Sequence, residues 1–272
     1  MKSPQFIKMS GAGNDFIIID NRDLAFAKEK MPELARKWCA RKLSVGADGL
    51  IFLENSEKAD FRWQFFNSDG SEAEMCGNAS RCVARLAFEM GMAPKSMRFE
   101  TIAGIIEAEI LEDGVKAKLT DPRDQRFFFP LDVAGAKFNV SFVNTGVPHV
   151  VLLVDDVETS PVVEHGRLIR NHPAFAPAGT NVNFAQFLRG GEIKLRTYER
   201  GVEDETLACG TGAVAAAIVR SAADASFSPI SVHTRGGMTL AVHFTKKGLT
   251  WKDIYLEGEA RIIYRAEMGP DA

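Results

Sequence analysis

The sequence lacks the features that mark several common classes of protein. Its 33 Lys and Arg residues are slightly outnumbered by 36 Asp and Glu residues, so there is no basic excess for a nucleic-acid partner. No run approaches the roughly 18 apolar residues that a membrane span needs. The N-terminal stretch MKSPQFIKMSGAGND has neither a continuous apolar segment nor a small-residue cleavage site. We therefore expect no nucleic-acid or membrane partner, and a cytoplasmic location.

Cysteine and histidine are also sparse. The four cysteines are Cys39, Cys76, Cys82 and Cys209, no pair of them has Cys-x-x-Cys spacing, and the five histidines are scattered. This arrangement is a weak case for zinc. A chain of 272 residues with 46% apolar content can bury a substantial core without disulfides. We expect neither a metal site nor a disulfide framework.

One stretch of the chain occurs twice. EAEMCGNASRCVARLA at 72–87 matches ETLACGTGAVAAAIVR at 205–220 after a shift of 133 residues. The same shift, without a gap, pairs Gly13 with Gly146, Gly46 with Gly179, Thr101 with Thr234, and Gly104 with Gly237. A constant register over so many turn residues predicts two similar halves. We place these halves at 1–121 and 122–261, and expect a final strand in 262–272 to complete the first.

In each half, a cysteine follows a strand and a polar turn and precedes a helix. FRWQFF at 61–66 and EIKLRTY at 192–198 are strand-like, and AVAAAIV after Cys209 predicts a helix buried on most sides. A thiol at a helix N-terminus lies near unpaired N–H groups and the positive end of the dipole, so we expect its pKa to fall. The glycine after each cysteine lets N–H groups approach a carboxylate. Either cysteine taken alone would more often be a buried packing residue, but the pair in register at two helix starts favours catalysis.

Other segments predict the remaining elements. FIKMSGAGNDFIIID predicts two strands around a glycine turn, and the β-branched run after that turn argues against a dinucleotide loop. Pro32 begins a predicted amphipathic helix that continues to Leu43, with Leu34, Trp38 and Leu43 on its apolar side. Cys39 and Cys82 are read as packing residues. DPRDQRFFFP at 121–130 is read as the crossing between the halves, and ARIIYRAEM as a last strand that pairs with the first half.

These motifs resemble those of the diaminopimelate epimerases. The resemblance covers nearly the whole chain and includes, in order, SGAGNDF, GADG, FNSDGSEAEMCGN, TGVPH, GTNVNF and YERGVEDETLACGTGA. It implies an α+β fold with two pseudo-symmetric domains, each a curled, barrel-like mixed β-sheet around a central helix, and an active site in the cleft between them. It also implies a homodimer that interconverts LL- and meso-diaminopimelate without a cofactor, in the lysine and cell-wall precursor pathway.

The resemblance assigns roles to individual positions. Cys76 and Cys209 match the acid/base pair, and His149 and Glu199 match residues that modulate the pKa values of the thiols. The α-carboxylate cradle would be Gly77, Asn78, Gly210 and Thr211, and the other substrate contacts would be Asn14, Asn67, Asn181, Glu199 and Arg200. The guanidinium of Arg200 suits the distal carboxylate, because it can form a two-pronged pair. The chain departs from the family pattern at Gly49, Ala79 and Val147, so substrate contacts at Gly49 and Val147 would come from the backbone or from other residues.

Elementary chemistry agrees with this reading. The α-proton of an amino acid is very weakly acidic, and inversion needs a base on one face of the carbon and an acid on the other. Two alternatives remain open: a racemase of the same architecture acting on proline or hydroxyproline, and a non-catalytic binding protein. Taken singly, the three asparagines could be turn residues, Glu199 and Arg200 a surface ion pair, and His149 a core histidine.

Overall fold

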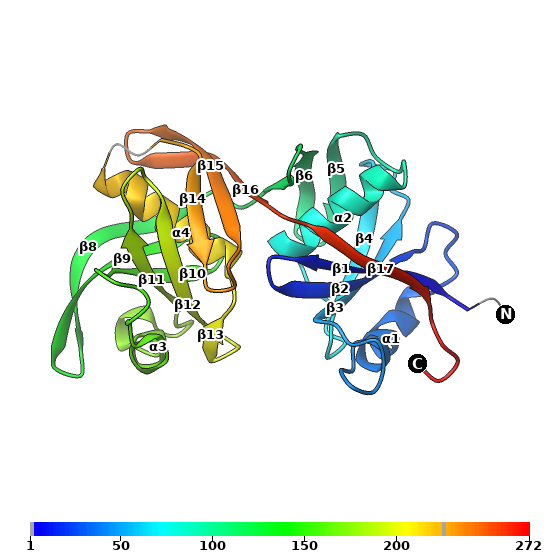
Figure 1. Ribbon diagram of the computed structural model, residues 1–272, viewed down its shortest axis with the longest axis horizontal. Coiled ribbons are helices and arrows are strands. Elements are labelled where there is room, and N and C mark those ends of the chain that lie inside the picture. The colour runs from blue at the N-terminus through cyan, green and yellow to red at the C-terminus, as the bar shows by residue number, and fades with distance from the viewer. Residues whose placement is uncertain (1–2, 225–226) are drawn as a thin grey trace. The chain divides into compact units, whose positions relative to one another are not determined.

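The computed structural model describes residues 3–224 and 227–272. The chain forms two compact units, one of residues up to Ala117 together with Gly258–Ala272, and one of Lys118–Glu257 (Figure 1). Both boundaries lie slightly before the expected ones. Leu119 N–H donates to the Ile254 carbonyl at 2.9 Å, so the residues after Lys118 belong with the second unit. Arg85 donates to the Ala260 carbonyl at 2.5 Å, which ties the residues before Arg261 to the first.

The first unit is a mixed sheet with two α-helices. Its strands are β1 (Gln5–Gly11), β2 (Asn14–Asp20), β3 (Gly49–Glu54), β4 (Phe61–Asn67), β5 (Ser96–Thr101), β6 (Gly104–Ile110), β7 (Val115–Lys118) and β17 (Arg261–Glu267). Its helices are the short 3-10 helix η1 (Lys28–Lys30), α1 (Met31–Trp38) and α2 (Gly77–Glu89). The strands pair in the order β17-β1-β2-β3-β4-β5-β6-β7, with β2·β3 and β4·β5 parallel and the other pairs antiparallel.

This sheet is covered by apolar side chains on both faces. On β2, Ile17 and Ile19 pack toward α1, whereas Phe16 and Ile18 pack toward α2. Because successive side chains of a strand point to opposite faces, a strand covered on both sides carries a continuous apolar run. The run FIIID therefore has no polar alternation.

The second unit contains the remaining elements. Its strands are β8 (Arg123–Val133), β9 (Ala136–Asn144), β10 (Pro148–Leu153), β11 (Asn181–Phe187), β12 (Ile193–Glu199), β13 (Asp204–Thr206), β14 (Ile230–Thr234), β15 (Thr239–Lys247) and β16 (Thr250–Gly258). Its helices are α3 (Val162–Arg170), the 3-10 helix η2 (Pro173–Phe175) and α4 (Gly210–Ala223). The strands pair in the order β8-β9-β10-β11-β12-β14-β15-β16, with β10·β11 and β12·β14 parallel. β13 adds to β12.

The two units repeat one pairing pattern, as the duplicated sequence predicts. The paired turn glycines also share a backbone conformation: φ is 96° at Gly13 and 105° at Gly146, and 113° at Gly104 and 77° at Gly237. Left-handed φ values of this kind favour glycine, which explains why these positions keep the same residue in both halves. One strand breaks the order of the repeat. β17, from the end of the chain, takes in the first unit the place that β8 holds in the second, so the predicted return of ARIIYRAEM to the first half is confirmed.

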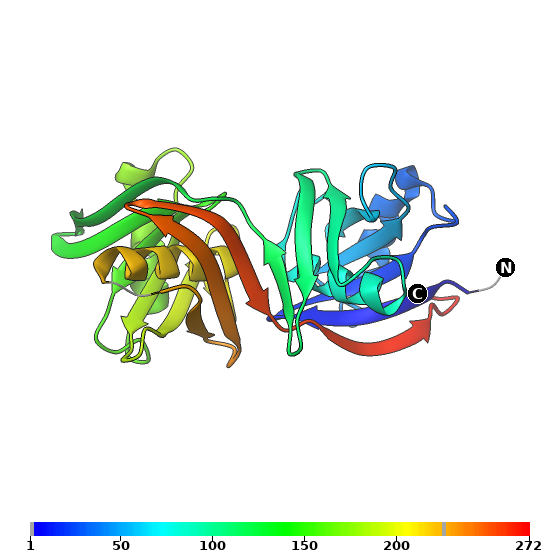
Figure 2. The ribbon, with the colours of Figure 1, turned by 90° about the horizontal axis from the view of Figure 1, so that it is seen from above.

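Each sheet curls around one buried helix. Every residue of α4 from Gly212 to Ser221 is buried, and the helix packs against β9, β10, β11, β12 and β15. Figure 2 shows this gold helix running inside the curve of the sheet. Small alanine side chains allow the strands to approach on several sides, so the prediction of a helix buried on most sides is confirmed. Among the residues described, no helix is long and apolar enough to cross a membrane.

Two predicted elements are wrong. The helix that begins near Pro32 ends at Trp38, and Leu43, expected on its apolar side, is 86% exposed in the following turn. The segment DPRDQRFFFP is no linker, because most of it forms β8, which pairs with β9 inside the second unit. Its register is irregular on both sides of Arg126, whereas Pro130 lies in the regular part of the pair, opposite Asn139.

Gly166→Ala should destabilise the second unit. A Cβ atom at this α3 position would lie 2.5 Å from Cβ and 2.6 Å from Cγ of Tyr198, which is itself buried. Overpacking of this kind costs about 1–3 kcal/mol and should exceed the roughly 1 kcal/mol that alanine gains over glycine in a helix. Chemical denaturation measures the change. The control is Gly269→Ala, whose added methyl meets no heavy atom within 4 Å; equal stability of the two variants would contradict the packing argument.

Candidate active site

The two cysteines of the repeat occupy equivalent backbone positions. Cys76 precedes the first residue of α2 with φ −145° and ψ 123°, and Cys209 precedes the first residue of α4 with φ −127° and ψ 108°. Both conformations are extended, so the following residue, a glycine in each case, begins the helix. The first N–H groups of a helix have no intrahelical partner. Each corner therefore places a thiol beside N–H groups that can bind an anion.

We call the predicted site residues of the first unit, Asn14, Asn67, Cys76, Gly77 and Asn78, the first half-site. Two of its side chains, Asn14 and Asn78, form a hydrogen-bonded chain with two neighbouring residues. Asn78 Nδ2 donates to Asn14 Oδ1 at 2.7 Å, and Asn14 Nδ2 donates to Asp48 Oδ2 at 3.0 Å. At the other end, Arg81 Nη2 donates to Asn78 Oδ1 at 2.6 Å. The strand turn after β1 and the start of α2 are thus joined beside Cys76.

Asn67 occupies a different part of the first half-site. It ends β4, opposite Gly49 in the strand register, and its Nδ2 donates to Ser71 Oγ at 3.0 Å. A Cβ atom at position 49 would lie 2.5 Å from the Phe65 ring and 2.9 Å from the Phe66 carbonyl. No amide side chain fits there without a rearrangement of β4, so the departure at Gly49 is a packing requirement.

The second half-site consists of His149, Asn181, Glu199, Arg200, Cys209, Gly210 and Thr211. His149 of β10 and Asn181 of β11 are partners in a parallel strand pair, and both are buried. Asn181 Oδ1 accepts from the Arg200 N–H at 2.8 Å, while its Nδ2 donates to the Pro148 carbonyl at 3.0 Å. Thr211 Oγ1 lies 3.6 Å from the Cys209 sulfur. Residues from four segments of the chain therefore meet within this unit.

The expectation of a lowered pKa is wrong for Cys209. Burial, and next the nearby charge of Glu199, raise the pKa of the Cys209 thiol to about 12. The N–H groups of Thr211 and Gly212 act in the predicted direction, but desolvation of the buried sulfur outweighs them. Burial also raises the pKa of the Glu199 carboxyl. Cys209 is therefore a thiol at neutral pH in this structure.

His149 is a buried, neutral imidazole. Burial, and then the charge of Arg200, lower the pKa of His149 to about 3. Asn183 Nδ2 lies 3.1 Å from His149 Nδ1 and donates to the Val150 carbonyl at 2.8 Å, while Thr197 Oγ1 donates to Asn183 Oδ1 at 2.9 Å. The amide therefore donates to Nδ1, and the proton of the ring is on Nε2. Within the described residues, Nε2 has no hydrogen-bond partner.

Three polar residues of these networks were missed from the sequence: Asp48, Arg81 and Asn183. A signal existed for Asp48, because the 133-residue shift pairs it with Asn181, as it pairs Asn67 with Arg200. Arg81 is a charged residue within the buried part of a helix, which is itself unusual. Asn183 lies in the buried strand β11 and has no comparable signal, since its partners come from β10 and β12.

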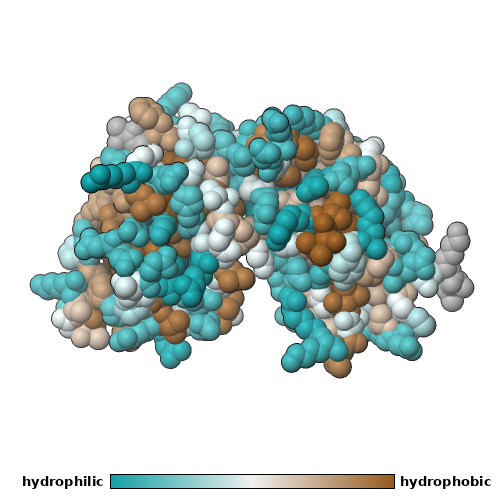
Figure 3. All heavy atoms as spheres, viewed as in Figure 1, coloured by the Kyte–Doolittle hydropathy of each residue, from teal (hydrophilic) through white to brown (hydrophobic). Residues whose placement is uncertain are grey.

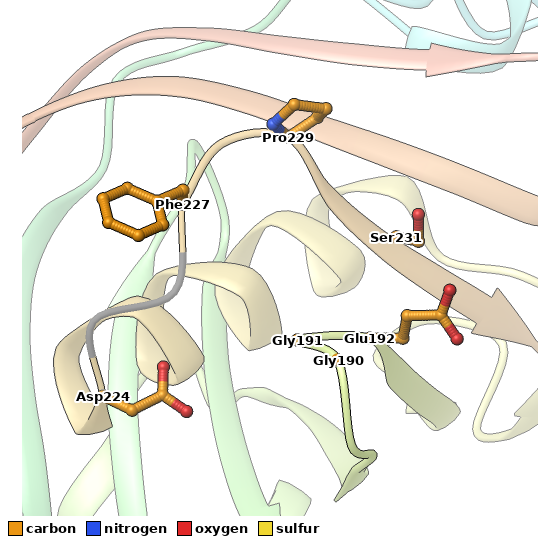
Figure 4. A pocket seen from close by; sticks show the side chains of 7 residues that line it. All are labelled: Gly190, Gly191, Glu192, Asp224, Phe227, Pro229 and Ser231. Atoms are coloured by element: carbon orange, nitrogen blue, oxygen red, sulfur yellow. The ribbon is translucent and has the colours of Figure 1, made fainter.

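Two surface hollows lie in the second unit. One, of about 460 Å³, is lined by Gly190, Gly191, Glu192, Asp224, Phe227, Pro229 and Ser231, none of which is a predicted site residue (Figure 4). The other, of about 520 Å³, includes Pro148 and Ala178 in its lining. It borders the second half-site, because Arg200 Nη1 donates to the Ala178 carbonyl at 3.0 Å. In the described parts of the chain, no cluster of three or more His, Cys, Asp or Glu residues could hold a metal ion.

Comparisons with known proteins identify the same family over most of the chain. Residues 6–123 and 141–263 match the family described as diaminopimelate epimerase. A diaminopimelate epimerase of Aquifex aeolicus (strain VF5) is 46% identical over 98% of both chains. One of Chlorobaculum tepidum is 44% identical over 94% of this chain and 98% of its own.

Solved structures of low sequence identity share the fold. A phenazine biosynthesis protein of the PhzF family from Bacillus anthracis superposes with a TM-score of 0.77 at 18% identity, over 99% of this chain and 100% of that chain. A hydroxyproline epimerase from Agrobacterium vitis superposes with a TM-score of 0.68 at 16% identity, over 100% and 95%. At these identities the likeness describes the architecture alone.

The buried imidazole predicts a pH-dependent stability. Folded His149 binds a proton only near pH 3, whereas an unfolded histidine binds one near pH 6.5, so its contribution is present above pH 6.5 and is lost as the pH falls toward 3. Between pH 7 and pH 4.5, the wild type should lose roughly 2–3 kcal/mol more stability than His149→Gln. Urea titrations of both proteins across this range measure the difference. Parallel pH profiles would show that the imidazole titrates freely in the folded protein.

Proposed function

Because the chain belongs to the diaminopimelate epimerase family, we propose that it interconverts LL- and meso-diaminopimelate by inverting one α-carbon. The observation that carries the proposal is the pair of equivalent corners, Cys76 before α2 and Cys209 before α4, each followed by a glycine. In this proposal both half-sites act on one substrate, and the two sulfurs approach the α-carbon from opposite faces. A name shared by relatives of up to 46% identity supports the substrate.

Proton transfer is divided between the two thiols. One sulfur, as a thiolate, removes the α-proton while the other, as a thiol, returns a proton to the opposite face, and the roles exchange in the reverse direction. The enclosed Cys209 is protonated before substrate binds, which suits it to begin as the donor while Cys76 begins as the base. Burial, and next the charge of Glu199, oppose a negative charge on Cys209, while the imidazole of His149 remains neutral.

The remaining residues hold the substrate. N–H groups of Gly77, Asn78, Gly210 and Thr211 would bind the α-carboxylate, where negative charge increases in the transition state. Arg200, Asn181, Asn14 and Asn67 would bind the distal amino-acid group, with the guanidinium on its carboxylate. The proposal requires no cofactor, since the two sulfurs and these donors account for both proton transfers.

We infer that the enzyme is a cytoplasmic homodimer of the lysine and cell-wall precursor pathway. Ile263 and Tyr264 of β17 are 50% and 43% exposed, and Figure 3 shows an apolar patch over this strand. Apolar surface of this kind supports a contact with a second copy. Light scattering of the purified protein would measure its mass directly.

The experiment that tests the activity is proton NMR of LL-diaminopimelate with the enzyme in deuterated water. We expect loss of the α-proton signal and formation of the meso isomer. Proline and trans-4-hydroxyproline serve as competing substrates, because they lack a second amino-acid group for Arg200 and Asn181. Exchange of the proline α-proton in preference to that of diaminopimelate would instead support the racemase alternative, and no exchange of any of these would support a binding protein.

Cys76→Ala and Cys209→Ala should each abolish epimerisation but differ in what remains. A positioned acid or base contributes roughly 10²- to 10⁴-fold, and the two thiols act as a unit, so each loss should span several orders of magnitude. A substrate analogue with a leaving group on the β-carbon needs only deprotonation to eliminate. One variant should therefore process the L centre and the other the D centre. The same stereochemical preference in both variants would refute the two-base mechanism.

Arg200→Lys should reduce turnover as well as affinity. Lysine retains the charge but cannot form the two parallel hydrogen bonds that orient a carboxylate. Because binding energy at the distal group positions the reacting carbon, kcat should fall along with a rise in KM. Arg167→Lys, an exposed position on α3, is the matched control and should retain the wild-type kinetics. Normal kinetics of Arg200→Lys would place the distal carboxylate elsewhere.

A further inference from the structure

We propose that Arg81 is a positioning residue that orients the amides of Asn78 and Asn14 so that they present N–H donors to the substrate. The proposal rests on the function proposed above and deepens it. It assigns a role to a residue that lies behind the half-site and does not touch the substrate. Arg81 would act through the amide groups of Asn78 and Asn14.

Arg81 is completely buried, with no exposed surface. Besides Asn78 Oδ1, its guanidinium reaches the Gly77 carbonyl at 3.3 Å and the Glu259 carbonyl at 3.5 Å. These partners are neutral oxygens, and burial lowers the pKa of Arg81. Holding a charged group in such surroundings is costly, so a site that retains one has a use for its donors.

The polarity of the chain follows from its two ends. A guanidinium can only donate hydrogen bonds and a carboxylate can only accept them. With Arg81 at one end and Asp48 at the other, each amide between them must accept with its oxygen and donate with its nitrogen. A 180° rotation of the side-chain amide of Asn78 or Asn14 would place two donors or two acceptors opposite each other. The orientation of both amides is therefore determined by the residues at the ends.

This polarity determines what remains available for a ligand. Each amide nitrogen carries two hydrogens, of which the chain uses one, while the oxygens of Asn78 and Asn14 each face a donor within the chain. These two N–H groups add to the N–H groups at the start of α2, which have no partner within the helix, so donors gather beside Cys76. A carboxylate, which only accepts, matches them. A carboxamide would direct its own N–H groups at some of these donors.

In the second half-site, backbone groups orient the amide of Asn181. Asn181 Oδ1 accepts from the Arg200 N–H, and its Nδ2 donates to the Pro148 carbonyl, so this amide too retains one free N–H. Only in the first half-site does a charged side chain set the orientation. The Arg81 charge also attracts a negative charge on Cys76.

The test compares Arg81→Met with Arg81→Lys, using deuterium exchange at the α-carbon of LL-diaminopimelate and at the amide-bearing α-carbon of its monocarboxamide. In Arg81→Met the Asn78 amide is free to turn, so the preference for the acid over the amide should narrow by about 10- to 100-fold, the value of one charged hydrogen bond. Arg81→Lys keeps a cationic donor and should recover a clear part of the preference.

Arg85→Met is the matched control. Arg85 lies one turn further along α2 and donates to the Ala260 carbonyl, much as Arg81 donates to that of Glu259, but it is 42% exposed and outside the chain of amides. It should leave the preference unchanged. An unchanged preference in folded Arg81→Met, or no recovery in Arg81→Lys, would overturn the proposal. Absence of exchange in the wild type would instead refute the proposed function.

A measurement on the wild type covers the case in which Arg81→Met does not fold. In nitrogen-15 spectra, the side-chain NH₂ signals of Asn78 and Asn14 should each show two separate protons in the free protein. On addition of meso-diaminopimelate, one proton of each pair should shift, because the unused N–H of Asn78 binds the α-carboxylate and that of Asn14 binds the rest of the substrate. Amide signals that remain unshifted at saturating ligand would overturn the assignment.

Discussion

The rest of the structure depends on one constraint, the burial of a single helix inside each curved sheet. α4 is enclosed along most of its length, so it can neither slide nor rotate without disturbing several strands. The position of its first residue is consequently as well defined as that of the core. The same holds for α2, whose buried face joins the strands of the first unit. A reactive group placed directly before such a helix inherits this rigidity, which catalysis by positioned groups requires.

The two half-sites fix their polar groups by different physical means. In the first, charged side chains at both ends of a chain orient two amides. In the second, backbone groups orient Asn181, and burial keeps both Cys209 and His149 uncharged. The surroundings of the two thiols are therefore unequal although their backbones are nearly equivalent. Such inequality suits a reaction in which one sulfur must carry a proton while the other lacks it.

Much of this arrangement could be predicted from the sequence, because turn glycines and the cysteine corners leave local signals that recur after a fixed shift. The sequence-based errors arise where tertiary contacts decide. Leu43 fits an amphipathic helix, but the chain turns after Trp38, and DPRDQRFFFP has the composition of a linker yet pairs as a strand. The pKa of Cys209 depends on how far the surrounding strands bury it. The role of Arg81 depends on the oxygen atoms that accept its hydrogen bonds. None of these neighbours is near in sequence.

In the first unit β17 takes the place that β8 holds in the second, and this difference affects the order in which the two units can fold during translation. The second unit is one continuous segment, so all of its strands have been synthesised once Glu257 has left the ribosome. The first unit, although it is translated earlier, lacks one of the two strands that pair with β1 until Arg261–Glu267 follow. The pairing of β1 with β17 joins the two ends of the chain, so it also closes the longest loop. The usual order of folding during translation, N-terminal domain first, is thereby reversed for the final step of assembly.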